Sequence, residues 1–253
     1  MNVHERREHI LNFVNFNKEV SFLEIRELIP DVSEMTLRRD LDYLNQHNKI
    51  IRVLGGAKSV DYLTNTSENA FAKRSGECAE EKALIAKKAA QLLRPDTTIF
   101  LGSGTTAMQL AQQVPDGKYH IVTTGLNCAI ELSSREDISV LMLGGSVNKN
   151  SYCVNGSIAS QMLENMSFQT AFLGVSGFTS SQGFFTSVVE DYVLRQKIIE
   201  RSECTVILMD SSKVNRKGIY NFAQLSDVDY VVSDGMLSQN VVDELTSNGV
   251  IVL

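Results

Sequence analysis

Residues 32–41 read Val-Ser-Glu-Met-Thr-Leu-Arg-Arg-Asp-Leu, and they carry the strongest structural signals near the start of the chain. Ser33 is a residue type that caps helix N-termini. Val32 and Leu37 stand at the two positions of a hydrophobic staple, in which the residue before the cap packs on the first turn of the helix. These signals predict a helix that begins at the Ser33 cap and ends near His47.

This predicted helix has one apolar stripe and one charged face. On a helical wheel Leu37, Leu41 and Leu44 fall within about 40° of one another. Arg39 lies opposite this stripe and Arg38 lies on its flank. Arginine donates in a fork to guanine or to phosphate, so a short helix with two exposed arginines suits the DNA major groove. The alternative is an ordinary helix with a solvated arginine pair.

The flanking segments complete a winged helix-turn-helix. A helix is predicted over 3–16, and the capping-box sequence Ser-Phe-Leu-Glu at 21–24 opens a second helix that Pro30 ends. After the arginine-bearing helix, residues 49–57 read Lys-Ile-Ile-Arg-Val-Leu-Gly-Gly-Ala. This segment predicts two short strands around a glycine turn, which form the wing.

DNA contacts are expected from the arginine-bearing helix and from the wing. The Thr36 hydroxyl can reach a phosphate or a thymine methyl, and the helix N-terminus itself favours a phosphate. Asp40, near the edge of the apolar stripe, is interpreted as the structural partner of an arginine such as Arg52. The predicted DNA-binding residues are Ser33, Met35, Thr36, Arg38, Arg39 and Arg52.

Charge is shared unevenly along the 253 residues. The net charge is −6, but residues 1–58 contain nine Lys or Arg and nine Asp or Glu, so the remainder carries the whole negative excess. A DNA contact therefore depends on the local placement of arginines and not on a generally basic surface.

Length and pattern together predict a DNA-binding domain over 1–58, a linker over 59–78 and a second domain over 79–253.

Composition argues against several other classes of protein. The chain is 43% hydrophobic and 21% charged, as in ordinary globular proteins. No apolar run approaches the roughly 18 residues of a membrane span, and the charged N-terminus is no signal peptide, so we expect a cytoplasmic protein that binds no membrane. The cysteines lie far apart and outside any metal-binding pattern, which predicts reduced thiols, no metal and no other cofactor. They are Cys78, Cys128, Cys153 and Cys204.

Beyond the linker, predicted helices and strands alternate. The strands are short apolar runs without polar alternation, which is typical of a parallel sheet with helices on both faces. The predicted strands cover 98–101, 120–124, 139–143, 171–175, 205–209, 230–233 and 250–253. The predicted helices cover 80–93, 105–114, 126–134, 157–165, 188–201 and 239–246.

Residues 99–108 read Ile-Phe-Leu-Gly-Ser-Gly-Thr-Thr-Ala-Met and run from a predicted strand through a glycine turn into a helix. The turn leaves backbone N–H groups at a positive helix end, beside two threonine hydroxyls, and this arrangement favours an anion. Glycines in such a turn can also serve packing alone. The turn is not a Rossmann fingerprint, because Ala107 occupies the third glycine position, and no Gly-Lys-Ser/Thr of a P-loop follows.

Further turns follow the neighbouring predicted strands. Residues 123–127 read Thr-Thr-Gly-Leu-Asn, 144–145 read Gly-Gly, and 174–177 read Gly-Val-Ser-Gly. Because the carboxyl ends of parallel strands converge on one crevice, these turns predict a ligand site there. Lys213 follows another strand and can add a cation, although an isolated lysine is commonly only solvated. The predicted effector-binding residues are Gly102, Ser103, Gly104, Thr105, Thr106, Thr123, Thr124, Asn127, Gly144, Gly145 and Lys213.

Residues 32–41, followed by Arg-Val-Leu-Gly-Gly-Ala at 52–57, resemble the hallmark of the DeoR family of repressors. Leu54 stands where many relatives carry a histidine in the wing. Residues 81–253 are similar to the DeoR-type sensor domain, which shares its architecture with ribose-5-phosphate isomerase and the CoA transferases. The resemblance implies a winged helix-turn-helix followed by a mostly parallel α/β/α sandwich.

The resemblance also implies sugar phosphates or related intermediates as effectors. By motif, residues 102–106 correspond to the family's phosphate loop. Thr123, Thr124 and Asn127 match its next ligand-side loop, and Lys213 matches the lysine of its Asp-x-Ser-Lys motif. We therefore expect a repressor of sugar or related carbon metabolism genes that binds double-stranded operator DNA as a dimer or larger oligomer. A phosphorylated sugar would release it from the operator or modulate it there.

Two alternatives come from other classes. A sugar-phosphate isomerase fused to a DNA-binding domain would need a positioned carboxylate after the fourth strand, where residues 174–179 read Gly-Val-Ser-Gly-Phe-Thr. Glu190 and Asp191 lie nearby, but at a helix start they fit an interaction with the helix dipole. A dinucleotide-binding redox sensor would need the fuller glycine fingerprint. We therefore expect no enzyme.

Overall fold

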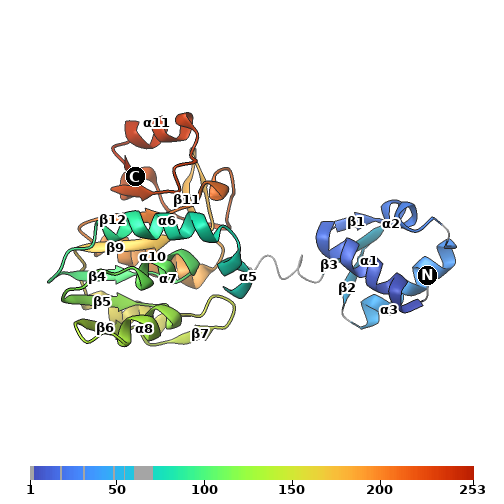
Figure 1. The fold of residues 1–253 in the computed structure, drawn as a ribbon, viewed down its shortest axis with the longest axis horizontal. Coiled ribbons are helices and arrows are strands. Elements are labelled where there is room, and N and C mark those ends of the chain that lie inside the picture. Colours follow the sequence, from blue (N-terminus) through green and yellow to red (C-terminus); the bar gives the residue numbers. More distant parts are fainter. Residues whose placement is uncertain (1–2, 18, 31, 48, 54, 60–70) are drawn as a thin grey trace. The chain divides into compact units, whose positions relative to one another are not determined.

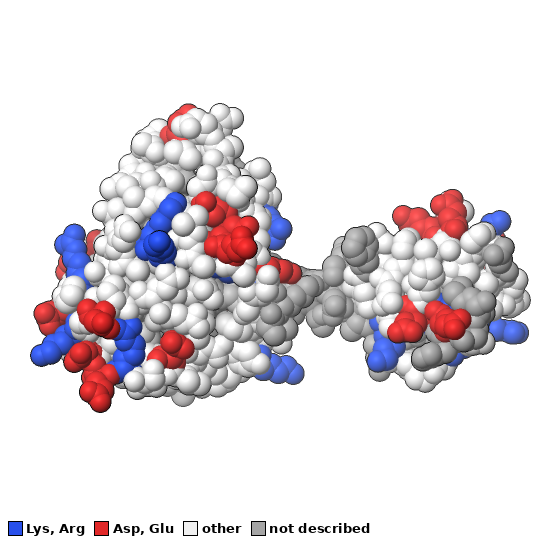
Figure 2. Space-filling model, in the orientation of Figure 1, with Lys and Arg blue, Asp and Glu red and all other residues white. Residues whose placement is uncertain are grey.

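Two units make up the chain, Met1–Ser67 and Glu68–Leu253, and each has its own hydrophobic core (Figure 1). The computed structural model describes residues 3–17, 19–30, 32–47, 49–53, 55–59 and 71–253. Leu54 of the predicted wing and residues 60–70 of the predicted linker lie outside the described residues. On the face drawn in Figure 2, basic and acidic side chains are interspersed over both units.

The N-terminal unit is a winged helix-turn-helix. Its three predicted helices and the two predicted wing strands are confirmed, and a further short strand, β1, joins the wing. The antiparallel sheet has the order β1-β3-β2. The elements are α1 (Val3–Asn17), β1 (Glu19–Ser21), α2 (Phe22–Leu28), α3 (Glu34–Gln46), β2 (Ile50–Val53) and β3 (Gly56–Ser59).

The helix starts follow the capping signals of the sequence. At α2 the Glu24 amide donates to the Ser21 hydroxyl at 3.2 Å, and the Glu24 carboxylate accepts from the Ser21 amide at 2.7 Å. Hydrogen bonds from the backbone and side chain of Ser21 lower the pKa of Glu24. At α3 the Thr36 amide donates to the Ser33 hydroxyl at 3.3 Å. The capping box and the N-cap predicted from sequence are therefore confirmed.

Asp40 is a structural residue, as expected, but the expected pairing with Arg52 is wrong. The Asp40 carboxylate accepts from Arg6 Nε at 2.6 Å and from Arg7 Nε at 2.7 Å, and its side chain is 2% exposed. Arg52 pairs instead with Asp42. These ion pairs join α1 to α3, and the paired residues are more than 30 positions apart in the sequence. The periodicity of α3 alone cannot reveal a partner on another helix.

The second unit contains a seven-stranded sheet in which every paired strand is parallel to its neighbour. The order is β15-β14-β12-β9-β4-β5-β6, so the direction of chain progression reverses between β4 and β9. Figure 1 shows β12, β9, β4, β5 and β6 side by side in this order. The bounds of all the strands of the sheet follow. They are β4 (Thr98–Leu101), β5 (Tyr119–Thr123), β6 (Ile138–Met142), β9 (Thr170–Gly174), β12 (Thr205–Leu208), β14 (Tyr230–Val232) and β15 (Ile251–Val252).

Helices cover both faces of this sheet, which confirms the predicted α/β/α sandwich. Ile99 and Leu101 of β4 pack with one core cluster, which includes residues of α6, α7 and α8. Phe100, between them, packs on the other face with residues of α9, α10 and α11. The helices are α5 (Phe71–Gly76), α6 (Ala79–Ala90), α7 (Thr105–Gln112), α8 (Leu126–Ser133), α9 (Ser157–Met162), α10 (Val189–Glu200) and α11 (Gln239–Ser247).

Two small antiparallel elements were not predicted. One is a hairpin, β7 (Ser146–Asn148) with β8 (Cys153–Asn155). The other is a sheet of β10 (Gly177–Thr179), β11 (Gly183–Thr186) and β13 (Tyr220–Ala223). Within the described part of the chain, no helix has both the length and the apolar character needed to cross a bilayer.

Candidate functional site

The exposed face of α3 carries three of the residues predicted to contact DNA, Met35, Arg38 and Arg39. Met35 is 63% exposed, and Arg38 and Arg39 are exposed as well. The Arg38 guanidinium lies over the Phe22 ring of α2, 4.5 Å from its centroid. No described residue forms an ion pair or hydrogen bond with the Arg39 guanidinium, so this group is available to an external partner.

The wing is tied to α3 by two contacts. The Arg52 side chain pairs with Asp42, and the Arg52 amide donates to Asn45 Oδ1 at 2.9 Å. A methyl group at Gly56 would lie 2.1 Å from the carbonyl oxygen of Val20, so β3 can approach β1 only with glycine at this position. The described part of the wing thus contacts α3 through Arg52 and is closed onto β1 at Gly56.

The two hydroxyls predicted at the DNA interface lie at the start of α3. Ser33 Oγ and Thr36 Oγ1 are 3.0 Å apart, next to the N-cap. Two acidic side chains of α3 are paired: Glu34 contacts Arg26 at 2.9 Å, and Asp42 contacts Arg52. This pairing reduces the repulsion that a DNA phosphate would meet at the helix start.

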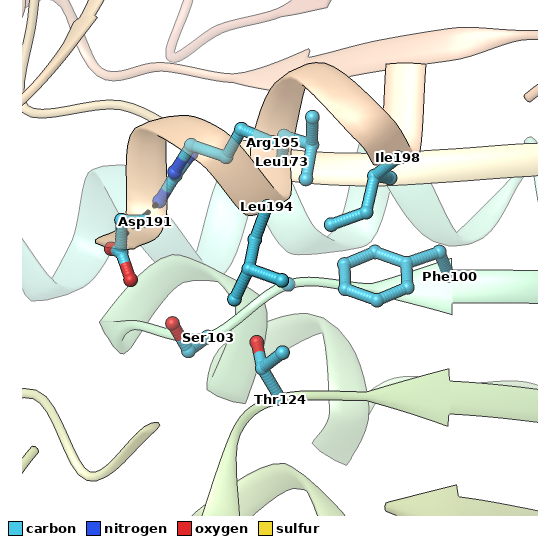
Figure 3. Close-up of a pocket in the computed structure, with 9 residues that line it drawn as sticks. Phe100, Ser103, Thr124, Leu173, Asp191, Leu194, Arg195 and Ile198 are labelled. Carbon is cyan, nitrogen blue, oxygen red and sulfur yellow. Dashed lines mark ion pairs between the residues drawn. The ribbon is translucent and has the colours of Figure 1, made fainter. Parts of the chain in front are cut away.

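A pocket that is open to solvent lies where the chain order reverses in the parallel sheet (Figure 3). Open α/β sheets bind ligands at this switch point. One part of the pocket wall is apolar. The other part is polar and lies where β4 and β5 end. Its residues are Phe100, Gly102, Ser103, Thr124, Leu173, Asp191, Leu194, Arg195 and Ile198.

The glycine turn after β4 forms one side of this pocket. Gly104 is the N-cap of α7 with φ of +108°, a conformation that requires glycine here. No described side chain caps this helix, so its first amides face outward from the helix end. Thr105 is buried and Thr106 is half-buried in the first turn of α7.

Neighbouring turns pack against the glycine turn. A methyl group at Gly125 would lie 3.3 Å from the Cα of Ser103, and one at Gly174 would lie 4.0 Å from the Ser103 carbonyl oxygen. The structure thus brings together the turns after β4, β5 and β9. Three predicted effector residues lie in the pocket wall, namely Gly102, Ser103 and Thr124.

The other predicted effector residues make local contacts. Thr123 Oγ1 is buried and accepts from the Gly125 amide at 2.9 Å. Asn127 is half-buried in the first turn of α8. The Gly144 amide donates to Met162 Sδ at 3.2 Å. A methyl group at Gly145 would lie 2.4 Å from the Asn155 carbonyl oxygen, so this glycine packs against β8.

Lys213 belongs to a charged cluster behind β12. Lys213 is the last residue of the short 3-10 helix Ser211–Lys213, and Asp210 is the residue before that helix. Lys213 Nζ lies 3.7 Å from Asp210 Oδ2. Burial lowers the pKa of the nearby Lys82, and the charge of Lys213 lowers it further. Lys82 Nζ donates to the carbonyl oxygens of Arg74 and Glu77, so this cluster holds the segment between α5 and α6.

Two charged residues of the pocket wall were not predicted to bind the effector. Asp191 Oδ2 lies 3.7 Å from Arg195 Nη2, one turn along α10. Asp191, Leu194, Arg195 and Ile198 are spaced i, i+3, i+4, i+7, the spacing of a buried helix face. This spacing could be seen in the sequence. It indicates that the oppositely charged side chains of Asp191 and Arg195 lie on the buried face of α10.

Comparisons with known proteins cover nearly the whole chain. The model of the DeoR-like helix-turn-helix domain matches residues 6–62, and that of the DeoR C terminal sensor domain matches 77–235. The HTH-type transcriptional regulator YulB of Bacillus subtilis is 33% identical over 237 residues, which cover 94% of this chain and 91% of that protein. The lactose phosphotransferase system repressor of Lactococcus lactis is 31% identical over 249 residues, 97% of this chain and 96% of that protein.

A solved structure is similar to part of the chain. Ribose 5-phosphate isomerase A from Methanocaldococcus jannaschii matches with a TM-score of 0.42 and 16% sequence identity, and the match covers 56% of each chain.

Proposed function

Since this chain belongs to the DeoR family of transcriptional regulators, we propose that it represses genes of sugar or related carbon metabolism and responds to a phosphorylated sugar. The protein binds double-stranded operator DNA through α3 and the wing, as a dimer or larger oligomer. The effector binds at the carboxyl edge of the parallel sheet and releases the protein from the operator or modulates it there.

The exposed guanidinium of Arg39 supports the DNA-binding part of the proposal. It lies on the face of α3 opposite the buried residues Leu37, Leu41 and Leu44. A guanidinium at this place can donate two hydrogen bonds to a guanine edge in the major groove. Paired DNA-binding units read half-sites about one helical turn apart, which is why an oligomer is expected.

The pocket at the switch point is the observation that carries the effector part of the proposal. Ser103 and Thr124 line it, beside the uncapped N-terminus of α7. Free amides at a helix N-terminus and its positive dipole favour a phosphate over a neutral group. A relative of this chain is named as the repressor of a lactose phosphotransferase system, which fits an effector derived from a sugar.

The proposal includes no catalytic activity. Isomerisation of a sugar phosphate needs a general base placed to accept a proton from carbon, and a carboxylate after the fourth strand is the group expected in that role. Residues 174–179, where β9 ends and β10 begins, contain no carboxylate. Asp191 does line the pocket, but it faces the guanidinium of Arg195 and the thiol of Cys153, which lies 3.8 Å away.

A thermal-shift screen with paired compounds tests this function. Each sugar phosphate is compared with its unphosphorylated sugar and with inorganic phosphate, using the full chain. At a hundredfold excess over its dissociation constant, a ligand of the folded state adds about 2.7 kcal/mol of stability. We expect a phosphorylated sugar to raise the melting temperature and its parent sugar to leave it unchanged, and the same compound to change operator affinity. Equal shifts from parent sugars, or no effect on operator binding, would contradict the proposal.

A further inference from the structure

Phe22 contacts both the wing and the arginine-bearing helix. It is the first residue of α2, and its ring is half-buried against the hydrophobic core of the N-terminal unit. Its amide donates to the carbonyl oxygen of Gly55, in the turn of the wing, at 2.7 Å. The guanidinium of Arg38, on α3, lies over its ring. A single residue of α2 therefore joins the wing turn to an arginine of α3.

The contact with Phe22 restricts the Arg38 side chain but leaves its hydrogen-bond donors available. The guanidinium carbon lies 4.5 Å from the ring centroid, within the range of a cation–π contact. A phenyl ring has no oxygen or nitrogen acceptor, so this contact does not use the N–H donors of the guanidinium in ordinary hydrogen bonds. No described residue forms an ion pair or a hydrogen bond with Arg38. Arg38 is thus placed by a neighbour and still able to donate to an external partner.

The two adjacent arginines of α3 occupy different places. Arg39 lies on the side of α3 opposite the buried leucines. Arg38 lies where α3 faces α2, because its guanidinium contacts the Phe22 ring. In helix-turn-helix proteins the second helix enters the major groove, whereas the first helix crosses the sugar-phosphate backbone. A donor between the two helices is therefore nearer to the backbone than to the base edges.

We propose that Arg38 binds a phosphate of the operator backbone and that Phe22 is its positioning residue. The ring restricts the guanidinium before DNA is bound, so binding does not have to immobilise a long and mobile side chain. Arg39 is left to read the base sequence. This inference rests on the DNA-binding part of the proposed function, because it needs α3 to be the recognition helix.

The role of Arg38 is tested by fluorescence anisotropy on the full chain with two duplexes at several salt concentrations. One duplex is an operator selected from a random duplex library, and the other is a scrambled sequence of the same length. Arg38→Ala should weaken binding to both duplexes by the same factor. It should also reduce the slope of log affinity against log salt by about 1, because one phosphate contact is lost. If Arg38→Ala weakens operator binding alone and keeps the salt slope, Arg38 reads a base and the inference is wrong.

Phe22→Leu tests the positioning role, because it keeps an apolar side chain against the core and removes the ring. It should weaken binding to both duplexes by about three- to tenfold, the cost of immobilising one long side chain. Phe22→Tyr keeps the ring and should restore wild-type binding. Phe13→Leu is the matched control, since Phe13 packs on the same core from α1 and no described arginine lies over its ring. It should bind both duplexes like wild type.

A double-mutant cycle separates positioning from a general effect on the fold. In the Arg38→Ala background, Phe22→Leu should change DNA affinity by less than about twofold. The same loss in both backgrounds, in proteins that melt like wild type, would show that Phe22 acts without Arg38 and would overturn the inference. A Phe22→Leu protein with wild-type affinity would overturn it as well.

Nuclear magnetic resonance of the DNA-free protein needs no variant of Phe22. The Nε–H proton of Arg38, assigned by its loss in Arg38→Ala, should resonate upfield of that of Arg39, because the face of a ring shields nearby protons. Equal positions of the two resonances would contradict the contact and the inference with it. Each of these results leaves operator recognition intact. If the wild-type protein enriches no sequence from the library, the proposed function itself fails.

Discussion

Asp234 shows how one buried carboxylate organises the loops beside the sheet edge. Its side chain accepts from the Ser211 amide at 2.9 Å, the Ser211 hydroxyl at 2.8 Å and the Met236 amide at 3.1 Å. It thereby joins the loop after β14 to the turn after β12 that leads to Lys213. Burial alone would raise the pKa of Asp234, but the hydrogen bonds from Ser211, Met236 and Ser233 outweigh burial and lower it.

The lowered pKa of Asp234 predicts a pH-dependent contribution to stability. The unfolded chain binds this proton more readily than the folded protein, so the contribution is complete above the unfolded pKa of 3.8 and is lost as pH falls through the folded value. Asp234→Asn should lower the free energy of unfolding by about 1–3 kcal/mol at pH 7. The difference from wild type should shrink below about pH 4.

Urea unfolding at several pH values between 7 and about 2.5 measures this difference, because the loss runs from the unfolded pKa of 3.8 down to the lower folded value. Asp243→Asn is the control, because Asp243 lies on an exposed part of α11 and contacts only Gln239 among the described side chains. A gap between Asp234→Asn and wild type that stays constant down to about pH 2.5 would show that ionisation of Asp234 does not contribute.

Single residues also mark what the sequence alone can reveal. The structural role of Asp40 could be predicted from its place near the apolar stripe, but its partners Arg6 and Arg7 come from another helix. Asp191 and Arg195 were identifiable in principle from the apolar residues that share their spacing. The sequence does not show that this face of α10 borders the pocket. That depends on the order of the strands in the sheet, which no local sequence pattern reveals.

At the level of elements, α3 was predicted well because two independent signals coincide. Ser33 marks its start, and the leucine stripe fixes which face is buried. The strands of the parallel sheet were found for a similar reason, since each is a continuous apolar run that both layers of helices bury. The hairpin β7–β8 and the sheet β10–β11–β13 were missed because their short strands mix polar residues or glycine with apolar ones, so the sequence shows no continuous apolar run there.

The exposed face of α3 leads to a prediction about sequence recognition. Arg39→Ala should leave the fold intact, because the side chain is exposed and no described residue pairs with it. The variant should lose about 1–3 kcal/mol of operator binding if the guanidinium contacts a base. Fluorescence anisotropy with an operator fragment and with scrambled DNA of the same length separates specific from non-specific binding.

Arg39→Lys is the matched variant for this experiment. It keeps the positive charge but cannot form the planar fork that reads guanine. It should therefore bind scrambled DNA like wild type and lose most of its preference for the operator. Wild-type operator affinity in a folded Arg39→Ala protein would rule out α3 as the recognition helix.

On the scale of the whole molecule, a chain of contacts runs from the pocket at the switch point to α5, the first described helix after residues 60–70. The Val154 amide of the β7–β8 hairpin donates to the carbonyl oxygen of Thr124, a pocket residue, at 2.8 Å. At the tip of the same hairpin, the Asn150 carbonyl oxygen accepts from the Phe71 amide of α5 at 3.0 Å. The rings of Phe71 and Tyr152 meet edge to face with centroids 5.5 Å apart.

This route predicts a variant that binds both ligands but couples them poorly. Effector and operator must change each other's affinity by the same factor, typically about 5–150-fold. Phe71→Ala removes the ring contact between α5 and the hairpin and leaves every pocket residue in place. We expect its effector affinity without DNA and its operator affinity without effector to match wild type. The coupling free energy should fall by about 0.5–2 kcal/mol.

Four dissociation constants decide the outcome: effector with and without operator, and operator with and without effector. The two ratios must agree within each protein, because binding free energies around a closed cycle sum to zero. Ile130→Ala is the control, since Ile130 is an exposed apolar residue of α8, 71% accessible, in the same unit. It should keep the wild-type ratio. If Phe71→Ala also keeps that ratio, the hairpin does not transmit the signal. The next contact to break would then be the one that Lys82, beside Lys213, makes with the carbonyl oxygens of Arg74 and Glu77 at the end of α5.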